Sequence, residues 1–351
     1  MRTLVGVLVA VAVLAAACGT DHPTTTANRT ATAQTRFPSP LPTLAPTPCA
    51  GPSNPCLAVV TRRGSDNELV SNVTDVAYPQ TLGALAPYLR PRLVSASEIA
   101  YIEACDVFTA PLVGFNRTRA LAATSGTCVV AFAWSPDAQS LAYLAVTDHQ
   151  TTEVHILREG KDALVATVAH RPALSLCSTQ ECADSSDFQF VWSPDGGVLM
   201  WNQSITSTFR IWTAGGVDVT PSLEDPSMAV WSGSSLYFQD SKGIEVFRSG
   251  AVSSFLPGVK WIKPSASPTG GEIVYESGDA SGPAHVYVVE TANASVNELG
   301  AGKSKAAFLT SRFVWYKGER PAGKTYIYDL QDGIQTESVV TSVNDVWPHA
   351  A

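Results

Sequence analysis

Two six-residue segments of this chain repeat each other, Phe-Ala-Trp-Ser-Pro-Asp at 132–137 and Phe-Val-Trp-Ser-Pro-Asp at 190–195. An apolar segment follows each copy, at 140–144 and at 198–201. Proline favours the first corner of a type I turn, and an aspartate in the turn hydrogen-bonds its own backbone. Each copy therefore predicts a β-strand, a tight turn and a second β-strand. The motif residues are Trp134, Ser135, Pro136 and Asp137 in the first copy and Trp192, Ser193, Pro194 and Asp195 in the second.

Degenerate copies of this turn recur along the chain, each before another apolar strand. The serines that anchor the six copies are Ser97, Ser135, Ser193, Ser232, Ser267 and Ser311, at steps of 38, 58, 39, 35 and 44 residues. All steps but one fit the four-stranded blade of a β-propeller, which takes roughly 40–45 residues. No amphipathic helix interrupts the alternating pattern. The spacing predicts an all-β propeller with four antiparallel strands in each blade.

The chain ends in Asn344-Asp345-Val346-Trp347, which has the pattern of a blade that lacks its later strands. We expect residues 57–63 and 68–77 to supply them, because pairing the two ends of the chain removes exposed strand edges. This gives seven blades, or six if residues 57–94 lie outside the ring. The one long step contains residues 170–187, which we expect to be an insertion tied by Cys177 and Cys182.

The Trp-Ser-Pro-Asp segments resemble the TolB-type and WD-repeat-like propeller families, in which this motif marks the turn after the first strand of a blade. The resemblance covers about residues 57–349. It implies a propeller and a general habit of protein binding or scaffolding in the cell envelope. Because these families include accessory domains of peptidases, the resemblance does not fix an activity.

The N-terminal segment has the pattern of an export signal. Residues 4–17 form an uninterrupted apolar run behind Arg2, too short for a permanent membrane helix but suited to the core of a signal peptide. Cys18 follows Ala15-Ala16-Ala17 directly, which resembles the lipobox of bacterial lipoproteins. We expect a signal peptide at 1–17 and a diacylglyceryl group on Cys18 that anchors the chain to the lipid bilayer. The alternative is an ordinary signal peptide that is cut after Ala17.

The cysteine count favours an oxidising compartment. The chain has seven cysteines, so removal of Cys18 as a lipid carrier leaves an even number. Neighbours in the sequence are the expected disulfide partners, although six cysteines allow 15 pairings. Metal ligation would need a Cys-x-x-Cys pair or a histidine cluster, and neither is present. The candidate pairs are Cys49 with Cys56, Cys105 with Cys128, and Cys177 with Cys182.

Residues 18–56 are rich in Thr, Pro, Ala and Ser, and such a stretch buries too little apolar surface to fold. We expect a tether that carries a propeller domain at 57–349. The formal net charge of −8 and the lack of a dense Lys/Arg cluster argue against a nucleic-acid partner. The predicted location is extracytoplasmic, at a bacterial cell membrane, and the predicted state is a monomer.

One segment matches a nucleotide-binding motif by letters alone. Gly318-Glu319-Arg320-Pro321-Ala322-Gly323-Lys324-Thr325 fits the phosphate-loop pattern, but that chemistry needs a helix after the loop. An alternating strand at 326–329 follows instead, which predicts a hairpin loop. The six histidines are scattered, and no Gly-x-Ser-x-Gly segment occurs. We therefore expect no catalytic residue, no metal site and no cofactor.

The remaining candidates are acidic loop residues and tryptophans. Carboxylates at a channel mouth could perform acid–base chemistry, but solvated loop charge is the default interpretation. Trp134, Trp192 and Trp231 precede equivalent turns, which suggests packing between blades. One ring among the others could stack on a sugar, but core packing accounts for them without that: Trp201, Trp212, Trp261 and Trp315. We predict a non-catalytic domain that binds a protein, a peptide or an envelope glycan, with residues 170–187 as a contact surface. The alternative is a hydrolase or lyase acting on a glycan or lactone. The acidic candidates are Asp184, Asp187, Asp240, Glu276 and Asp279.

Overall fold

The computed structural model describes residues 57–62, 67–71, 80–85, 91–95, 97–111, 116–124, 126–146, 151–169, 188–193, 196–202, 209–277, 283–319 and 323–347. They all belong to one compact unit, Gln34–Ala351. None of these residues forms a helix that is long and apolar enough to cross a membrane. Several predictions fall outside the described residues: the signal and tether at 1–56 with Cys18, Cys49 and Cys56, the insertion at 170–187 with Cys177 and Cys182, and the turn residues Pro194 and Asp195.

The strands form seven antiparallel sheets, six with four strands and one with three. The sheet that joins the two ends of the described chain contains β27 (Val340–Trp347), β1 (Leu57–Arg62), β2 (Asn67–Ser71) and β3 (Gln80–Leu85). The next contains β4 (Arg92–Ser95), β5 (Glu98–Glu103), β6 (Asp106–Pro111) and β7 (Thr118–Leu121). It is followed by β8 (Cys128–Trp134), β9 (Ser140–Val146), β10 (Thr151–Arg158) and β11 (Lys161–Ala169).

The three-stranded sheet contains β12 (Phe188–Trp192), β13 (Gly197–Asn202) and β14 (Phe209–Thr213). After it come β15 (Ser227–Ser232), β16 (Ser235–Gln239), β17 (Gly243–Arg248) and β18 (Ala251–Pro257). The sixth sheet has β19 (Trp261–Ala266), β20 (Glu272–Ser277), β21 (His285–Glu290) and β22 (Val296–Ala301). The last has β23 (Lys303–Phe308), β24 (Phe313–Gly318), β25 (Thr325–Asp329) and β26 (Gln335–Ser338).

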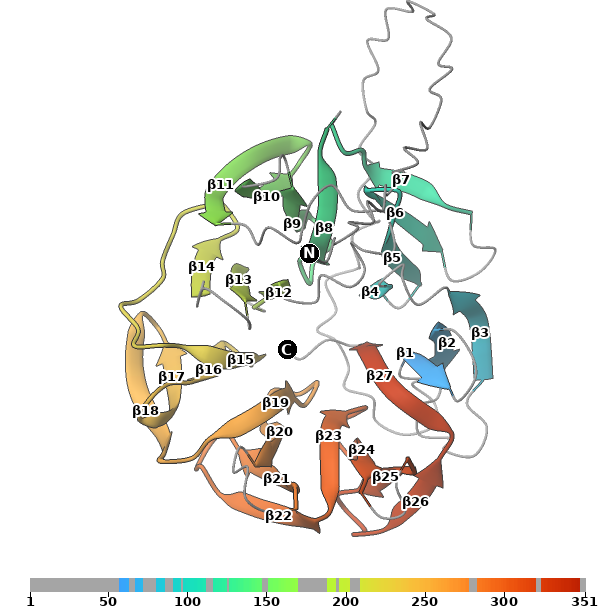
Figure 1. Cartoon of the computed structure of the whole chain (residues 1–351), viewed down its shortest axis with the longest axis vertical. Helices are drawn as coiled ribbons and strands as arrows, with labels where there is room; N and C mark the ends of the chain where they lie inside the picture. Colours follow the sequence, from blue (N-terminus) through green and yellow to red (C-terminus); the bar gives the residue numbers. More distant parts are fainter. Residues whose placement is uncertain are drawn as a thin grey trace, which may run out of the picture. The chain divides into compact units, whose positions relative to one another are not determined.

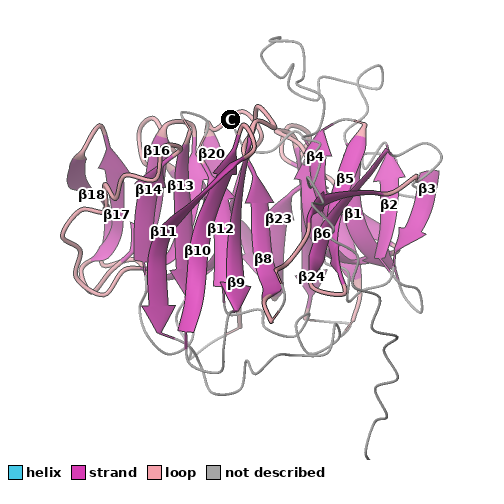
Figure 2. Ribbon diagram, turned by 90° about the horizontal axis from the view of Figure 1, so that it is seen from above, coloured by secondary structure: helices cyan, strands magenta, loops and turns pink. Residues whose placement is uncertain are grey.

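The sheets stand around a common centre, with β27, β4, β8, β12, β15, β19 and β23 nearest to it (Figure 1). Neighbouring sheets touch through these innermost strands: β27 contacts β4, β8 contacts β12, β12 contacts β15, and β19 contacts both β15 and β23. Seen from the side, the strands run between two faces that carry the connecting loops (Figure 2). The prediction of an all-β propeller built from four-stranded antiparallel sheets is confirmed.

The two ends of the described chain meet in one sheet, as predicted. β1 pairs with β27 in antiparallel register, with Val60 opposite Val343. Val60 and Val340 are both buried in a core cluster with Trp315 of the neighbouring sheet. The predicted strand at 68–77 corresponds to β2, whereas no sequence pattern predicted β3. The alternative in which residues 57–94 lie apart is wrong for β1–β3, because hydrogen bonding joins these strands to β27.

The serines of the two six-residue copies, Ser135 and Ser193, each close a hairpin turn. The Ser135 Oγ accepts a hydrogen bond from the Ser140 N–H at 2.9 Å, and the Ser193 Oγ accepts one from the Gly197 N–H at 2.7 Å. The Asp137 carboxylate accepts the Gln139 N–H at 3.0 Å, which is the local bond that the motif predicts. These bonds satisfy turn N–H groups that would otherwise lack a partner.

Two of the predicted anchor positions are wrong by one or two residues. Ser95, not Ser97, carries the accepting hydroxyl in its turn, since the Ser95 Oγ accepts the Ser97 N–H at 3.1 Å. Likewise Thr310, not Ser311, accepts the N–H of Phe313 at 3.0 Å. In both turns the hydroxyl accepts an N–H two or three residues later, whereas the Ser135 and Ser193 hydroxyls accept one five and four residues later.

Tryptophans join neighbouring sheets, as the sequence predicted. The Trp192 indole N–H donates to the Ala133 carbonyl of β8 at 2.9 Å, and the Trp261 indole donates to the Met228 carbonyl of β15 at 2.9 Å. Trp134 and Trp231 are also buried, with 6% and 5% of their surface exposed. Each buried hydrogen bond contributes about 1 kcal/mol, in addition to the large apolar area of the ring.

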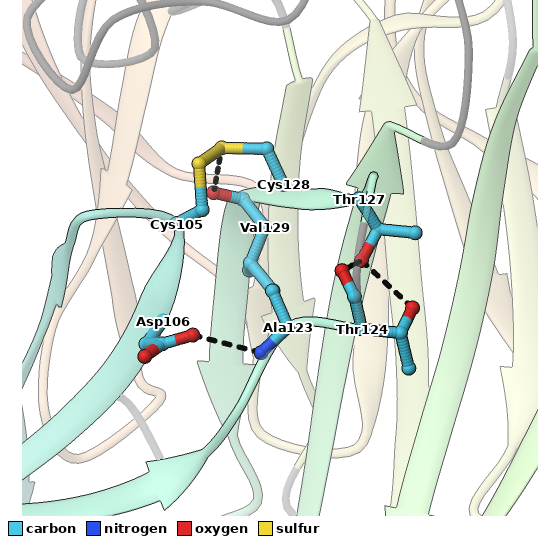
Figure 3. Close-up of a disulfide and its surroundings, with 7 residues drawn as sticks. All are labelled: Cys105, Asp106, Ala123, Thr124, Thr127, Cys128 and Val129. Carbon is cyan, nitrogen blue, oxygen red and sulfur yellow. Dashed lines mark hydrogen bonds between the residues drawn. A yellow bond between two sulfur atoms is a disulfide. The ribbon is translucent and has the colours of Figure 1, made fainter. Parts of the chain in front are cut away.

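A disulfide between Cys105 and Cys128 confirms one predicted pair, with a Cα–Cα distance of 4.4 Å (Figure 3). It links the β5–β6 turn to the first residue of β8, in the next sheet. The Val129 N–H also donates to the Cys105 carbonyl at 3.1 Å. A bond that closes a loop of 23 residues stabilises the fold by about 3 kcal/mol in the chain-entropy model.

Candidate functional site

The main candidate site is a cavity of about 580 Å³ at the centre of the ring of sheets. Residues of all seven innermost strands line it, together with two residues of β24. Its volume lies in the range of ordinary small-ligand and peptide sites. Because each innermost strand pairs with a neighbour on one side only, its other edge faces this cavity.

The tryptophan side chains of the cavity wall pack between the sheets. Trp134, Trp192, Trp231 and Trp315 line the cavity, yet no more than 6% of each is exposed. A tryptophan that stacks on a sugar needs an open ring face, and these four rings are covered. The described tryptophans of the wall therefore act as core residues, which was the default interpretation of the sequence.

The charged lining of the cavity is mainly cationic. It consists of Arg92, Lys263, Lys305, Lys317 and Asp345. Asp345 is held at the seam between β27 and β4, where it accepts the Leu93 N–H at 2.7 Å and lies 3.7 Å from the Arg92 guanidinium. Three lysines remain, in a chain whose net charge is −8.

Two of these lysines lie on an irregular backbone that recurs in neighbouring sheets. In β15, β19 and β23 the strand advances three residues while its partner advances two, so each carries one extra residue, a β-bulge. Met228, Lys263 and Lys305 lie at the three bulges with φ of 48°, 49° and 55°. This left-handed conformation costs a residue with a Cβ roughly 1–2 kcal/mol, and glycine usually occupies it.

Lys317 completes the cluster from the adjacent strand. It lies on β24 directly opposite Ser304, next to the bulge that carries Lys305. Burial and then the positive charges of Lys305 and Lys263 lower the pKa of Lys317. The three ammonium groups therefore share one part of the cavity, and we call them the lysine cluster.

The two acidic candidates within the described residues, Glu276 and Asp240, do not line the cavity. The Glu276 carboxylate accepts the backbone N–H of Lys305 at 2.9 Å, across the junction of two sheets. Asp240 accepts the N–H groups of Lys242 and Gly243 at 2.7 and 3.1 Å, in the β16–β17 turn. Asp184, Asp187 and Asp279 lie outside the described residues. The described carboxylates of this set thus have structural partners.

The segment that matches the phosphate-loop pattern is a hairpin, as predicted. β24 pairs with β25 on either side of it, and the Gly318 N–H donates to the Lys324 carbonyl at 2.9 Å. The Lys324 ammonium lies 2.6 Å from the Glu337 carboxylate, and the Thr325 hydroxyl donates to the Ser338 carbonyl at 3.0 Å. The Lys324 ammonium and the Thr325 hydroxyl, which would contact phosphate in such a motif, therefore bind to the neighbouring strand β26 instead.

The two described histidines, His155 on β10 and His285 on β21, both have carboxylate partners, and the His285 ring lies 2.7 Å from the Glu298 carboxylate. The His155 ring lies between the carboxylates of Asp162 and Glu153, at 3.1 and 3.2 Å, and stacks on Tyr143. Burial lowers the pKa of His155, but the two carboxylates outweigh it and raise that pKa above its usual value. Across the part of the chain that the structure describes, no group of three or more His, Cys, Asp or Glu residues could hold a metal ion.

The sequence did not single out the lysine cluster. With Ser267 and Ser311 as anchors, Lys263 lies four residues before its anchor and Lys305 lies six before, so the two positions do not align. Alignment on the strand ends, Ala266 and Phe308, would have paired the two lysines, since each lies three residues before the end of its strand. A repeat alignment built on strand ends rather than on serines is the signal that could have found the site.

No family model matches the chain, and no curated protein matches it by sequence. Solved structures match it by shape. Oligogalacturonate lyase from Vibrio parahaemolyticus has a TM-score of 0.51 at 8% identity over 82% of this chain and 91% of the other. The β-propeller domain of the Trilobed protease from Pyrococcus furiosus has a TM-score of 0.50 at 12% identity, covering 70% and 81%. TolB from Acinetobacter baumannii has a TM-score of 0.43 at 14% identity, covering 83% and 81%. At these identities the likeness shows a β-propeller fold alone.

Proposed function

We propose that this chain is a lipid-anchored extracytoplasmic protein whose propeller binds a partner protein, a peptide or an envelope glycan without catalysis. The observation that carries the proposal is the axial cavity, whose charged lining is four cations and one carboxylate that is itself held by a backbone N–H. Such a lining attracts a ligand, whereas glycan hydrolysis needs two carboxylates that flank the bond to be cleaved. The enzyme alternative stays a prediction.

We propose further that the seven sheets are seven blades of one ring. The support is the pairing of β27 with β1, because it places the first and last strands of the described chain in one sheet. A closed ring holds the cavity walls at fixed distances, so a ligand meets a preorganised site. We expect this domain to act as a monomer.

The anchoring part of the proposal rests on the sequence around Cys18 and on the composition of residues 18–56. At about 3.1 Å per residue in an extended polyproline-like chain, thirty residues would span up to ~90 Å. Labelled palmitate should follow the wild-type chain into the membrane fraction and should not label a Cys18→Ser variant. Equal labelling of the two chains would exclude lipidation at Cys18.

The binding part is tested with a photoreactive amino acid in the cavity. Replacement of Val230, which lines the cavity, by p-benzoylphenylalanine should give a discrete adduct after irradiation of intact cells. The matched control is the same amino acid at Val252 on the outer strand β18, where the side chain is 40% exposed. Equal adducts from both sites, or none from the cavity, would contradict a ligand in the cavity.

A further inference from the structure

We propose that the lysine cluster, Lys263, Lys305 and Lys317, binds the carboxylates of an acidic peptide segment that enters the axial cavity. The inference rests on the proposed binding function and names the chemistry of the ligand. Three observations carry it: the strained backbone at two of the lysines, the lack of carboxylate partners for the cluster, and the open strand edges beside it.

The backbone conformation is the first observation. Two neighbouring innermost strands, β19 and β23, hold a lysine with positive φ at the same bulge position. A bulge re-aims the side chain at its extra residue, and glycine would adopt this conformation without strain. Strain that persists at one recurring position, and that points two cations into one cavity, indicates a functional constraint.

The second observation is charge without local compensation. None of the three ammonium groups forms an ion pair with a carboxylate of the described residues, and the Glu276 carboxylate accepts the backbone N–H of Lys305 instead. Like charges on neighbouring strands repel each other, so the cluster destabilises the empty protein. A ligand with several negative charges would relieve that repulsion, so it would bind this site more tightly than an uncharged ligand of similar shape.

The third observation favours a peptide over a sugar. The indole faces of the wall are buried, so the cavity offers no open tryptophan for stacking on a sugar ring. The innermost strands β19 and β23 each pair on one side only, and extended peptides bind such edges through main-chain hydrogen bonds. Small side chains, Ala266 and Ala307, line the wall beside the lysines and leave room for a chain.

The test measures binding of fluorescein-labelled hexaglutamate to the detergent-solubilised full chain by fluorescence anisotropy at low salt. We expect hexaglutamate to bind and hexaglutamine not to bind. The triple variant Lys263→Gln/Lys305→Gln/Lys317→Gln should bind at least tenfold more weakly, and the triple Lys→Arg variant should stay within about threefold of wild type. The matched control is Lys161→Gln at an exposed lysine of β11, which should change nothing.

Two outcomes would overturn the inference. One is hexaglutamate binding that survives the triple Lys→Gln change. The other is displacement of hexaglutamate by trigalacturonate at a lower concentration than by unlabelled hexaglutamate, because the preferred ligand would then be an acidic glycan. Inorganic phosphate is the third competitor, and we expect it to displace the peptide only at a far higher concentration.

A glycine variant separates binding from a structural role. Lys305→Gly removes the charge and the strain together, so we expect the melting temperature to rise by about 2 °C while hexaglutamate binding falls as in Lys305→Gln. A fall in both quantities would mean that Lys305 supports the strand, and the inference would be wrong.

The photo-crosslinking experiment at Val230 distinguishes failure of this inference from failure of the proposed function. If the cavity adduct forms in cells but hexaglutamate never binds, the acidic-peptide inference fails and the binding function stands. If the adduct is absent and hexaglutamate binds with the expected dependence on the lysines, the proposed cellular ligand is wrong, whereas the lysine cluster remains an acidic-peptide site.

Discussion

The innermost strands β8 and β19 occupy equivalent places in two sheets but carry opposite kinds of residue. Each has one extra residue relative to its partner strand, between Val129 and Ala131 in β8 and between Ile262 and Ser265 in β19. In β8 the extra residue is Val130, which is 1% exposed and packs in a core cluster that includes Trp192. In β19 the bulge holds Lys263, which is exposed and has positive φ.

The extra residue therefore has a different role in each of these two strands. In β8 the irregularity is filled with an apolar side chain between two sheets, so it contributes to the stability of the ring. In β19 it places a cation towards the cavity, at a cost in backbone strain and charge repulsion. Changes near β8 should therefore affect the free energy of unfolding, and changes at the lysines of β19 and its neighbour should affect binding.

The largest effect is expected at Trp192, which packs against β8 and donates its indole N–H to Ala133. Trp192→Ala should lower the free energy of unfolding by about 4 kcal/mol, because a large cavity forms and the Ala133 carbonyl loses its donor. Guanidinium denaturation measures the change. Lys263→Ala is the matched change in β19 and should stay within about 0.5 kcal/mol of wild type. A loss at Lys263 as large as that at Trp192 would erase the contrast between the two strands.

The second effect concerns the disulfide that ties β8 to the preceding sheet. A Cys105→Ala/Cys128→Ala chain should lose about 3 kcal/mol of unfolding free energy, because its unfolded state is no longer closed into a loop of 23 residues and gains conformational entropy. Thermal and denaturant unfolding should agree on the direction. The single variant Cys128→Ala removes the same bond and serves as the control. Wild-type stability in the double variant would mean that the packing of β8 alone holds this junction.

A smaller effect should depend on pH, in the outer part of the same sheet. Burial lowers the pKa of His155, but Asp162 and Glu153 raise it further, so its folded pKa lies above the unfolded value of about 6.5. The stabilisation is complete below the unfolded pKa and is lost as the pH rises through the folded pKa. Urea unfolding should therefore show a loss of stability as the pH rises above about 6.5 that is absent in His155→Gln. A loss of equal size in that variant would assign the pH dependence to other groups.

The pH dependence of stability that comes from Asp162 has the opposite sign. Burial raises the pKa of Asp162, but hydrogen bonds with His155 and Tyr143 outweigh it and lower the pKa below 3.8. Its contribution is present above the unfolded pKa and is lost as the pH falls through the lowered folded pKa. Asp162→Asn should remove the acid dependence and weaken that of His155, which keeps Glu153 as a carboxylate partner.

The sequence contained enough to predict the propeller because its repeat is a local signal. Ser-Pro-Asp turns and alternating strands act over fewer than ten residues, so each sheet could be predicted without knowledge of the others. The pairing of β1 with β27 followed from the need to remove strand edges. The predicted disulfide between Cys105 and Cys128 followed from short loop length.

The candidate site could not be predicted in the same way, because it depends on register. A single extra residue moves every later side chain of a strand to the other face, so a period of two cannot place Lys263. The sequence also gives no distance between Lys305 and Lys263, which come from different sheets. Only the ring brings these two residues and Lys317 to one cavity.

The smallest effect is expected within the lysine cluster itself. Lys317→Met keeps the length of the side chain and removes one of three like charges, so it should stabilise the protein by roughly 0.2–0.5 kcal/mol at low salt. Salt screens repulsion over about 10 Å at 0.1 M, so the difference from wild type should shrink as the ionic strength rises. Lys161→Met, at an exposed lysine far from the cavity strands, should show no such trend. Destabilisation by Lys317→Met at every salt concentration would mean that the Lys317 ammonium group stabilises the fold as the apolar residues of β8 do, and the contrast with β8 would not hold for this part of the cavity.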